Sequence, residues 1–121
     1  MINVKDQVYA ALSAEFDNVS DIYPLTWESF PVIQYTEEAN NVVQKTDDRE
    51  QYAELRYRID IWSNGSTSTA AIKVDDALSP LGLTRVGCAD VPDPSNHRHK
   101  QMRYEGIIDV NSEQVYWPNS R

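Results

Sequence analysis

The residues best suited to covalent catalysis in this 121-residue chain are one cysteine and two histidines. Cys88 stands nine residues before His97, and His99 follows two residues later. A catalytic thiol needs a general base within hydrogen-bond reach, so the fold would have to bring Cys88 against an imidazole. A small core-facing thiol and two loop histidines explain the same residues without any chemistry. We therefore predict no nucleophilic active site.

Four potential metal ligands, Asp90, Asp93, His97 and His99, fall within ten residues. Carboxylate and imidazole groups both bind zinc. However, none of the standard zinc-ligand spacings occurs, and a flexible acidic loop has a similar composition. We predict no metal site, so a metal-dependent enzyme that uses segment 90–99 is the least favoured of three hypotheses.

Acid–base and phosphate chemistry have little support. Adjacent carboxylates occur at Glu37–Glu38, Asp47–Asp48 and Asp75–Asp76. Neighbouring residues point to opposite faces of a strand, or diverge by about 100° around a helix, so solvated charge explains these pairs. The glycine patterns GxGxxG and GxxxxGKS/T that cradle phosphates do not occur. The sequence thus predicts a protein that is not an enzyme and has no cofactor.

Length and charge limit the remaining classes. The 121 residues suit a single domain spanning 1–121. Eleven basic and nineteen acidic residues give a net charge of −8, which disfavours non-specific binding to nucleic acid or to anionic membranes. One cysteine cannot form an internal disulfide, which fits a reducing compartment. Because no long apolar run occurs, we expect neither a cleaved signal peptide nor a membrane span.

Two amphipathic strands dominate the predicted fold. Segment 52–62 alternates apolar and polar residues without glycine or proline, and 99–110 alternates similarly around Gly106, which we expect to mark a β-bulge. The other expected elements are helices at 4–16 and from Ser66 or Thr67 to Leu78, short strand pieces at 19–24, 32–35 and 83–89, and loops at 36–44 and 90–96. This order predicts an α+β fold with a mainly antiparallel sheet of four to five strands, two helices packed on one face, and the order α-β-β-(β)-α-β-β.

The polar side of segment 52–62 is the best candidate for an interaction surface. It carries aromatic and arginine residues, the types enriched at protein interfaces. For Trp62, covering one edge of the core is an equally good interpretation. We interpret a short basic stretch around 98–103 as the rim of a subunit interface rather than as a nucleic-acid site. The predicted interface residues are Tyr52, Arg56, Arg58, Trp62, Arg98, Lys100 and Arg103.

Several stretches carry a resemblance to a known family. They are the opening helix 4–16, VSDIYP (19–24), FPVIQYTEEAN (30–40), RYRIDIWSNGSTSTAAIKVDDAL (56–78), LGLTRVGCAD (81–90) and HKQMRYEGIID (99–109). In this layout the chain resembles, over nearly its full length, the tail-completion (tail-terminator, head–tail joining) proteins of long-tailed phages. The shared features are patterns of strand and helix, and no catalytic signature is among them.

The resemblance implies helices packed against an antiparallel sheet, and a ring, usually hexameric, at the head-proximal end of the tail tube. Such rings stop tube growth and join tail to capsid without enzymatic activity or a cofactor. The implied partners are copies of the chain, the tail tube and head-connector proteins, with DNA passing without specific binding, in the virion or in the host cytoplasm during assembly. The alternative hypothesis is a small acidic inhibitor, such as an immunity protein or antitoxin, that binds one basic partner.

Overall fold

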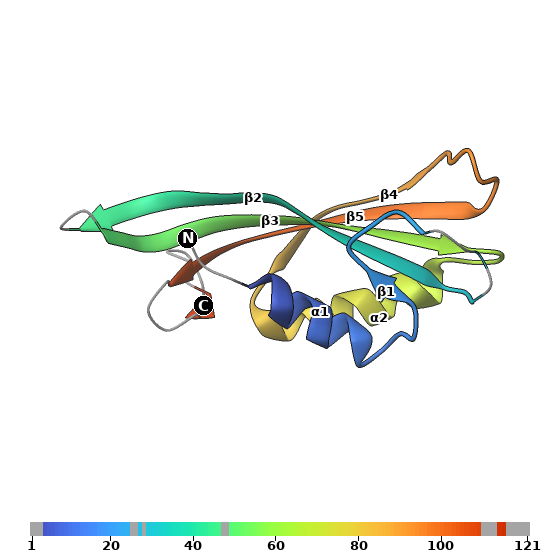
Figure 1. Cartoon of the computed structure of the whole chain (residues 1–121), viewed down its shortest axis with the longest axis horizontal. Helices are drawn as coiled ribbons and strands as arrows, with labels where there is room; N and C mark the ends of the chain where they lie inside the picture. The colour runs from blue at the N-terminus through green and yellow to red at the C-terminus, as the bar shows by residue number, and fades with distance from the viewer. Residues whose placement is uncertain (1–3, 25–26, 28, 47–48, 110–113, 116–121) are drawn as a thin grey trace.

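A mixed β-sheet carries helices on one of its faces (Figure 1). The computed structural model describes residues 4–24, 27, 29–46, 49–109 and 114–115, and only the backbone at 42–46, 49–52, 108–109 and 114–115. The strands are β1 (Val19–Ser20), β2 (Val32–Thr46), β3 (Arg49–Ser63), β4 (Thr84–Val91), β5 (Arg98–Asp109) and β6 (Gln114–Val115). The helices are α1 (Lys5–Ser13), α2 (Ser68–Leu78) and the short 3-10 helix η1 (Ser79–Leu81).

The strands lie in the order β1-β2-β3-β5-β4, and β6 pairs with β5. Neighbouring strands run antiparallel except β1 and β2, which are parallel. The predicted fold class is therefore confirmed, with one parallel pair in a mainly antiparallel sheet. The predicted element order is also observed, although β1 occupies only two residues of the strand piece expected at 19–24.

β3 confirms the phase predicted for segment 52–62. Ala53, Leu55, Tyr57, Ile59 and Ile61 are buried on the face that the helices cover. Because side chains alternate along a strand, the even-numbered residues of β3 point to the opposite face. We call this opposite face the outer face of the sheet.

Gly106 does not mark a β-bulge, so that prediction is wrong. β5 pairs with β3 along all 12 of its residues without a register shift. The irregularity nearby lies in β4 instead, between Arg85 and Gly87. A Cβ atom at Gly106 would lie 3.1 Å from Cδ2 of the buried Leu83. Glycine therefore makes room for the leucine that precedes β4.

The loop predicted at 36–44 is also wrong, because this segment belongs to the 15-residue β2. Its polar side chains are satisfied by the strand that pairs with it: Glu37, for example, accepts a 2.6 Å hydrogen bond from the Tyr57 hydroxyl of β3. Register shifts after Glu37 and after Val42 interrupt the period-two pattern. Pairing with β3 thus determines a strand that local composition does not favour.

Both predicted helices are present. α1 lies within the predicted range 4–16, and Thr67 takes the N-cap position of α2 without a side-chain capping bond. As expected, Pro80 and Gly82 end the second helical region. Gly82 has a left-handed φ of 86° and donates its N–H to the Ser79 carbonyl at 2.8 Å. Neither α1 nor α2 has the length and apolar character needed to cross a membrane.

The hydrophobic core lies between the helices and the inner face of the sheet. Val8 and Leu12 of α1 and Val74 and Leu78 of α2 are fully buried there. The spacing of four within each pair places both side chains on one face of the helix. The described helices cover only part of the sheet, and β2 and β3 continue beyond them as a long hairpin (Figure 1).

Candidate functional site

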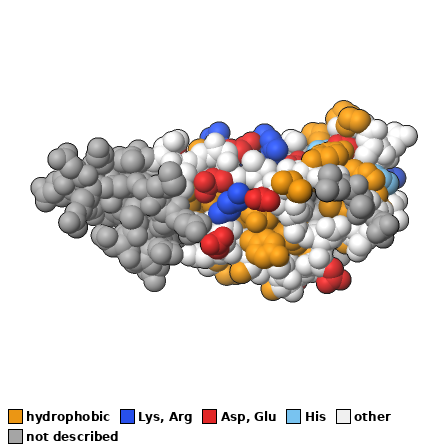
Figure 2. Space-filling view, in the orientation of Figure 1, with side chains coloured by type: hydrophobic (Ala, Val, Ile, Leu, Met, Phe, Trp, Pro, Cys, Tyr) orange, Lys and Arg blue, Asp and Glu red, His pale blue; other side chains and the backbone are white. Residues whose placement is uncertain are grey.

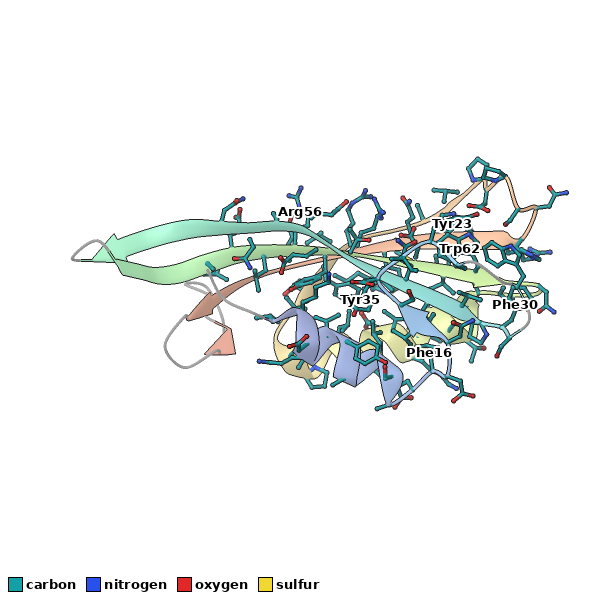
Figure 3. All side chains as sticks on the ribbon, viewed as in Figure 1. Phe16, Tyr23, Phe30, Tyr35, Arg56 and Trp62 are labelled. Carbon is teal, nitrogen blue, oxygen red and sulfur yellow. The ribbon has the colours of Figure 1, made fainter. Side chains whose placement is uncertain are left out.

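Trp62, one of the predicted interface residues, is buried within its own chain. It lies on the outer face, as its place in the alternation requires, but only 2% of its surface is exposed. Tyr23 and Trp27 pack against its ring at centroid distances of 5.4 and 5.8 Å, and His99 stacks on it at 4.4 Å (Figure 3). Trp62 therefore belongs to a second, smaller cluster on the side of the sheet opposite the core.

Within this cluster, His99 is held between two carboxylates. Its Nε2 lies 2.7 Å from Oδ1 of Asp60, and its Nδ1 lies 3.5 Å from Oδ1 of Asp93. Asp60 and His99 are only 2% and 9% exposed. Arg58 donates from Nε to the second oxygen of Asp60 at 2.9 Å.

Asp93 connects the turn between β4 and β5 to this cluster. Its Oδ2 accepts hydrogen bonds from the backbone N–H of Ser95 at 2.9 Å and from the hydroxyl of Tyr23 at 3.3 Å. Burial opposes ionisation of this carboxyl, but hydrogen bonds led by those from Ser95 outweigh it and hold the pKa of Asp93 below its ordinary value. Burial, followed by the charge of Asp93, raises the pKa of Tyr23. One carboxylate thus holds together the turn, the segment before β2 and His99.

The histidine–aspartate pair does not have the geometry of a nucleophilic active site. In such sites one ring nitrogen of the histidine faces the carboxylate and the other faces the nucleophile. Both ring nitrogens of His99 face carboxylates. Cys88 lies on the core side of β4, but it is exposed there, and no contact joins it to either histidine in the part of the chain that the structure describes. The geometry favours a structural role for the network.

The candidate metal ligands of segment 90–99 come together only in part. Asp93 and His99 are neighbours, but Asp90 forms an ion pair with Lys100 at 3.0 Å. Across residues 4–24, 27, 29–41 and 53–107, no three histidine, cysteine or acidic side chains gather as a metal site would require. Three of the four candidate ligands thus form ion pairs within the fold, and His97 packs against Trp27 and Phe30.

Two carboxylates interpreted as solvated charge instead serve buried tyrosines. Tyr57 and Tyr104 lie opposite each other in the core, and their hydroxyls donate to Glu37 at 2.6 Å and to Asp75 at 2.8 Å. Burial, followed by these hydrogen bonds, raises the pKa of both phenols far above the ordinary value. The third carboxylate pair, 47–48, lies outside the described residues.

Arginines and glutamates pair across the outer face away from the buried cluster. Arg56 on β3 and Glu105 on β5 lie directly opposite each other and form an ion pair (Figure 3). Arg58 and Arg103 are also opposite each other, and Glu38 of β2 contacts Arg103 Nε at 3.1 Å and Arg58 Nη1 at 3.6 Å. Like charges that face each other destabilise a strand pair, so Glu38 offsets their repulsion.

The seven predicted interface residues do not form one surface. Three of the arginines share the outer face, as described above. Arg98 and Lys100 lie on the helix-bearing face, because their register partners belong to the inner side of β3. Arg98 lines an open hollow of about 650 Å³ beside the start of α2. The side chain of Tyr52 lies outside the described residues.

The segment that covers the outer-face cluster was not identified from the sequence. Ile22 and Tyr23 are 56% and 48% exposed, and Trp27 and His97 pack against each other and against Phe30. Figure 2 shows hydrophobic side chains at the surface of this end of the protein. Three aromatic residues within 23–30, in a stretch without strand or helix periodicity, were the available signal.

Comparison with known proteins identifies no family. No protein-family model matches the chain. No curated protein matches it significantly.

Proposed function

We propose that the protein is a structural assembly component that forms a ring, in the role of a tail-completion protein that caps the tail tube and joins tail to head in a long-tailed phage or prophage. The observation that supports this most is the extent of the sheet relative to its cover. β2, β3 and β5 run beyond the described helices, and β2 and β3 continue as a hairpin (Figure 1). No described helix packs on this part of the ribbon. A ribbon of strands without a packed layer is marginally stable in water, so a neighbouring subunit is expected to support it.

The charges of the outer face are compatible with this role. Arg56, Arg58 and Arg103 all pair with carboxylates of the same chain. These arginines are therefore not available as a separate cationic patch to hold a phosphate backbone. With a net charge of −8, the chain repels DNA, as a channel wall that lets DNA pass should.

Light scattering coupled to size-exclusion chromatography, followed by negative-stain electron microscopy, tests the proposal. We expect a closed ring, either from the protein alone or after addition of tail tubes. A strict monomer that remains monomeric at high concentration and ignores tail tubes would overturn it. Capsid and tail genes on both sides of the coding gene would support it independently.

The exposed Ile22 and Tyr23 favour a second candidate, the acidic inhibitor. Aromatic side chains dominate the energetics of many interfaces, and a net negative charge steers a basic partner. Recovery of one basic protein at equal stoichiometry, with no ring in the absence of that protein, would support the inhibitor. A ring that recovers no such partner would exclude it.

A further inference from the structure

Both edges of the sheet are open among the described strands. β4 has a strand partner on one side only, where it pairs with β5. On the other edge, β1 pairs with β2 only at Ile33 and Gln34. No described strand therefore covers that side of β2 from 35 to 46. An open edge presents a row of backbone donors and acceptors to any strand that can align with it.

A short stretch of each edge lacks lysine and proline, although register shifts lie close to both stretches. Monomeric β-proteins commonly place lysine or proline on edge strands. Residues 86–89 of β4 include neither, and Val86 is 53% exposed beside the exposed Cys88. Residues 39–42 of β2 also include no charge and no proline. Residues 86–89 and 39–42 bring no charged side chains of their own into such a contact, and the nearest acidic residues, Asp90 and Glu38, flank the two stretches.

The strand directions suit a head-to-tail contact. β2 is antiparallel to β3, β3 to β5, and β5 to β4, so β2 and β4 run in opposite directions. Rotation about an axis along the strands preserves these directions in every copy. β4 of one copy then meets β2 of the next in the antiparallel arrangement, which is the more stable one. Because the two edges differ, the contact leaves an open edge at each end until the ring closes.

We propose that copies of the chain join by pairing β4 of one copy with the open edge of β2 in the next, which gives one sheet continuous across the subunits. The inference rests on the proposed function for the identity of the partner, a second copy of the chain. In such a sheet the helices of all copies lie on the same side. Residues of one face in one copy therefore meet residues of the same face in its neighbour.

The single cysteine provides a probe of this contact. Cys88 lies on the helix-bearing face of β4, because its register partner Met102 is buried there. Asn40 of β2 lies on the same face, and Asn41 lies on the outer face, as their register partners on β3 show. Disulfide geometry requires short Cα separations and side chains on the same side, so it distinguishes the two positions.

The experiment places one cysteine at a time at positions 36 to 42 in the chain that retains Cys88, and follows oxidation on non-reducing gels. We expect a ladder of covalent oligomers up to the ring size from helix-face positions such as Asn40→Cys. The flanking Ala39→Cys and Asn41→Cys variants should show near loss of the ladder. Adding Cys88→Ser should abolish it. Ile72→Cys, at a 64% exposed position of α2, measures random collision.

Each other outcome is decisive when circular dichroism confirms the native fold. Disulfide dimers of the unmodified protein through Cys88 alone would show β4–β4 pairing and overturn the inference. Crosslinking at 36–42 no stronger than in Ile72→Cys would also overturn it. Rings in light scattering without crosslinks at any helix-face position would reject the edge contact while the proposed function stands. A monomer without crosslinks that ignores tail tubes would reject both.

Discussion

Replacing Asp60 by alanine is predicted to destabilise the fold by about 3 kcal/mol. Asp60 receives hydrogen bonds from both His99 and Arg58, at 2.7 and 2.9 Å. Removal of one member of a buried ion pair typically costs about 3–5 kcal/mol, because the remaining charge loses its compensation. The side chain of Arg58 is 30% exposed and can turn toward water, so we expect the lower end of that range.

Urea unfolding measures this loss. For a domain of this size, with an m-value of about 1.5 kcal/mol/M, a loss of about 3 kcal/mol lowers the unfolding midpoint by about 2 M. Tryptophan fluorescence reports on the cluster because His99 stacks on Trp62, and circular dichroism reports on the whole sheet. Asp76→Ala makes the same substitution at an exposed position of α2, and should change the stability by less than about 0.5 kcal/mol.

A loss below about 1 kcal/mol in Asp60→Ala would refute the reasoning, because exposed ion pairs contribute that much. Asp60→Asn separates charge from hydrogen bonding. Its amide oxygen can still accept from Nε2 of His99, so a loss smaller than that of the alanine variant is expected. Equal losses in the two variants would instead assign the stabilisation to the charge of the carboxylate alone.

Three further predictions concern other contacts. The pKa of Asp93 is depressed in the folded protein, so its contribution to the free energy of unfolding is full above the unfolded pKa of about 3.9 and disappears as the pH falls through the folded pKa. The urea midpoint of Asp93→Asn should therefore decline less on acidification than that of the unmodified protein. Tyr57 and Tyr104 have raised pKa values, so their contribution to the free energy of unfolding is full below about pH 10 and falls above it. The variants Tyr57→Phe and Tyr104→Phe should each lose about 1.5–3 kcal/mol of stability at neutral pH. Their stability should decline less steeply in alkali than that of the unmodified protein, and an unchanged alkaline profile would count against these hydrogen bonds as the cause. Gly106→Ala should cost about 1 kcal/mol through its contact with Leu83, and the two substitutions Gly106→Ala and Leu83→Ala should be less than additive in a double-mutant cycle.

The two long strands β3 and β5 are predictable because their signal is local. Alternation places residues such as Leu55 and Ile59 on one side, and the structure buries them there. The apolar alternation of β5 is interrupted only at Gly106, where Leu83 from the neighbouring segment occupies the space of the missing side chain. A bulge and a close approach both select glycine, and only the position of Leu83 distinguishes the two.

β2 could not be predicted because the groups that satisfy it come from other strands. Glu37 and Glu38 read as a turn, yet Tyr57 donates to the first and Arg103 to the second. Their partners are 20 and 65 residues away in the sequence. Register shifts within the strand also remove the period-two pattern on which a sequence prediction depends. The network around Asp60 could not be predicted for the same reason, because its imidazole partner, His99, lies 39 residues further along the chain.

Trp62 shows what alternation cannot decide. Trp62 and Arg56 have the same parity on β3, and both lie on the outer face, yet Trp62 is covered and Arg56 is half exposed (Figure 3). The pattern assigns each side chain to a face, whereas the cover of that face comes from Tyr23 and Asp93 in remote segments without periodicity. One end of the outer face is therefore closed by the protein's own chain and fixed by a buried charge network. In the proposed ring, a neighbouring subunit can therefore contact only the open part of the sheet and its two edges, and the proposed contact lies at these edges.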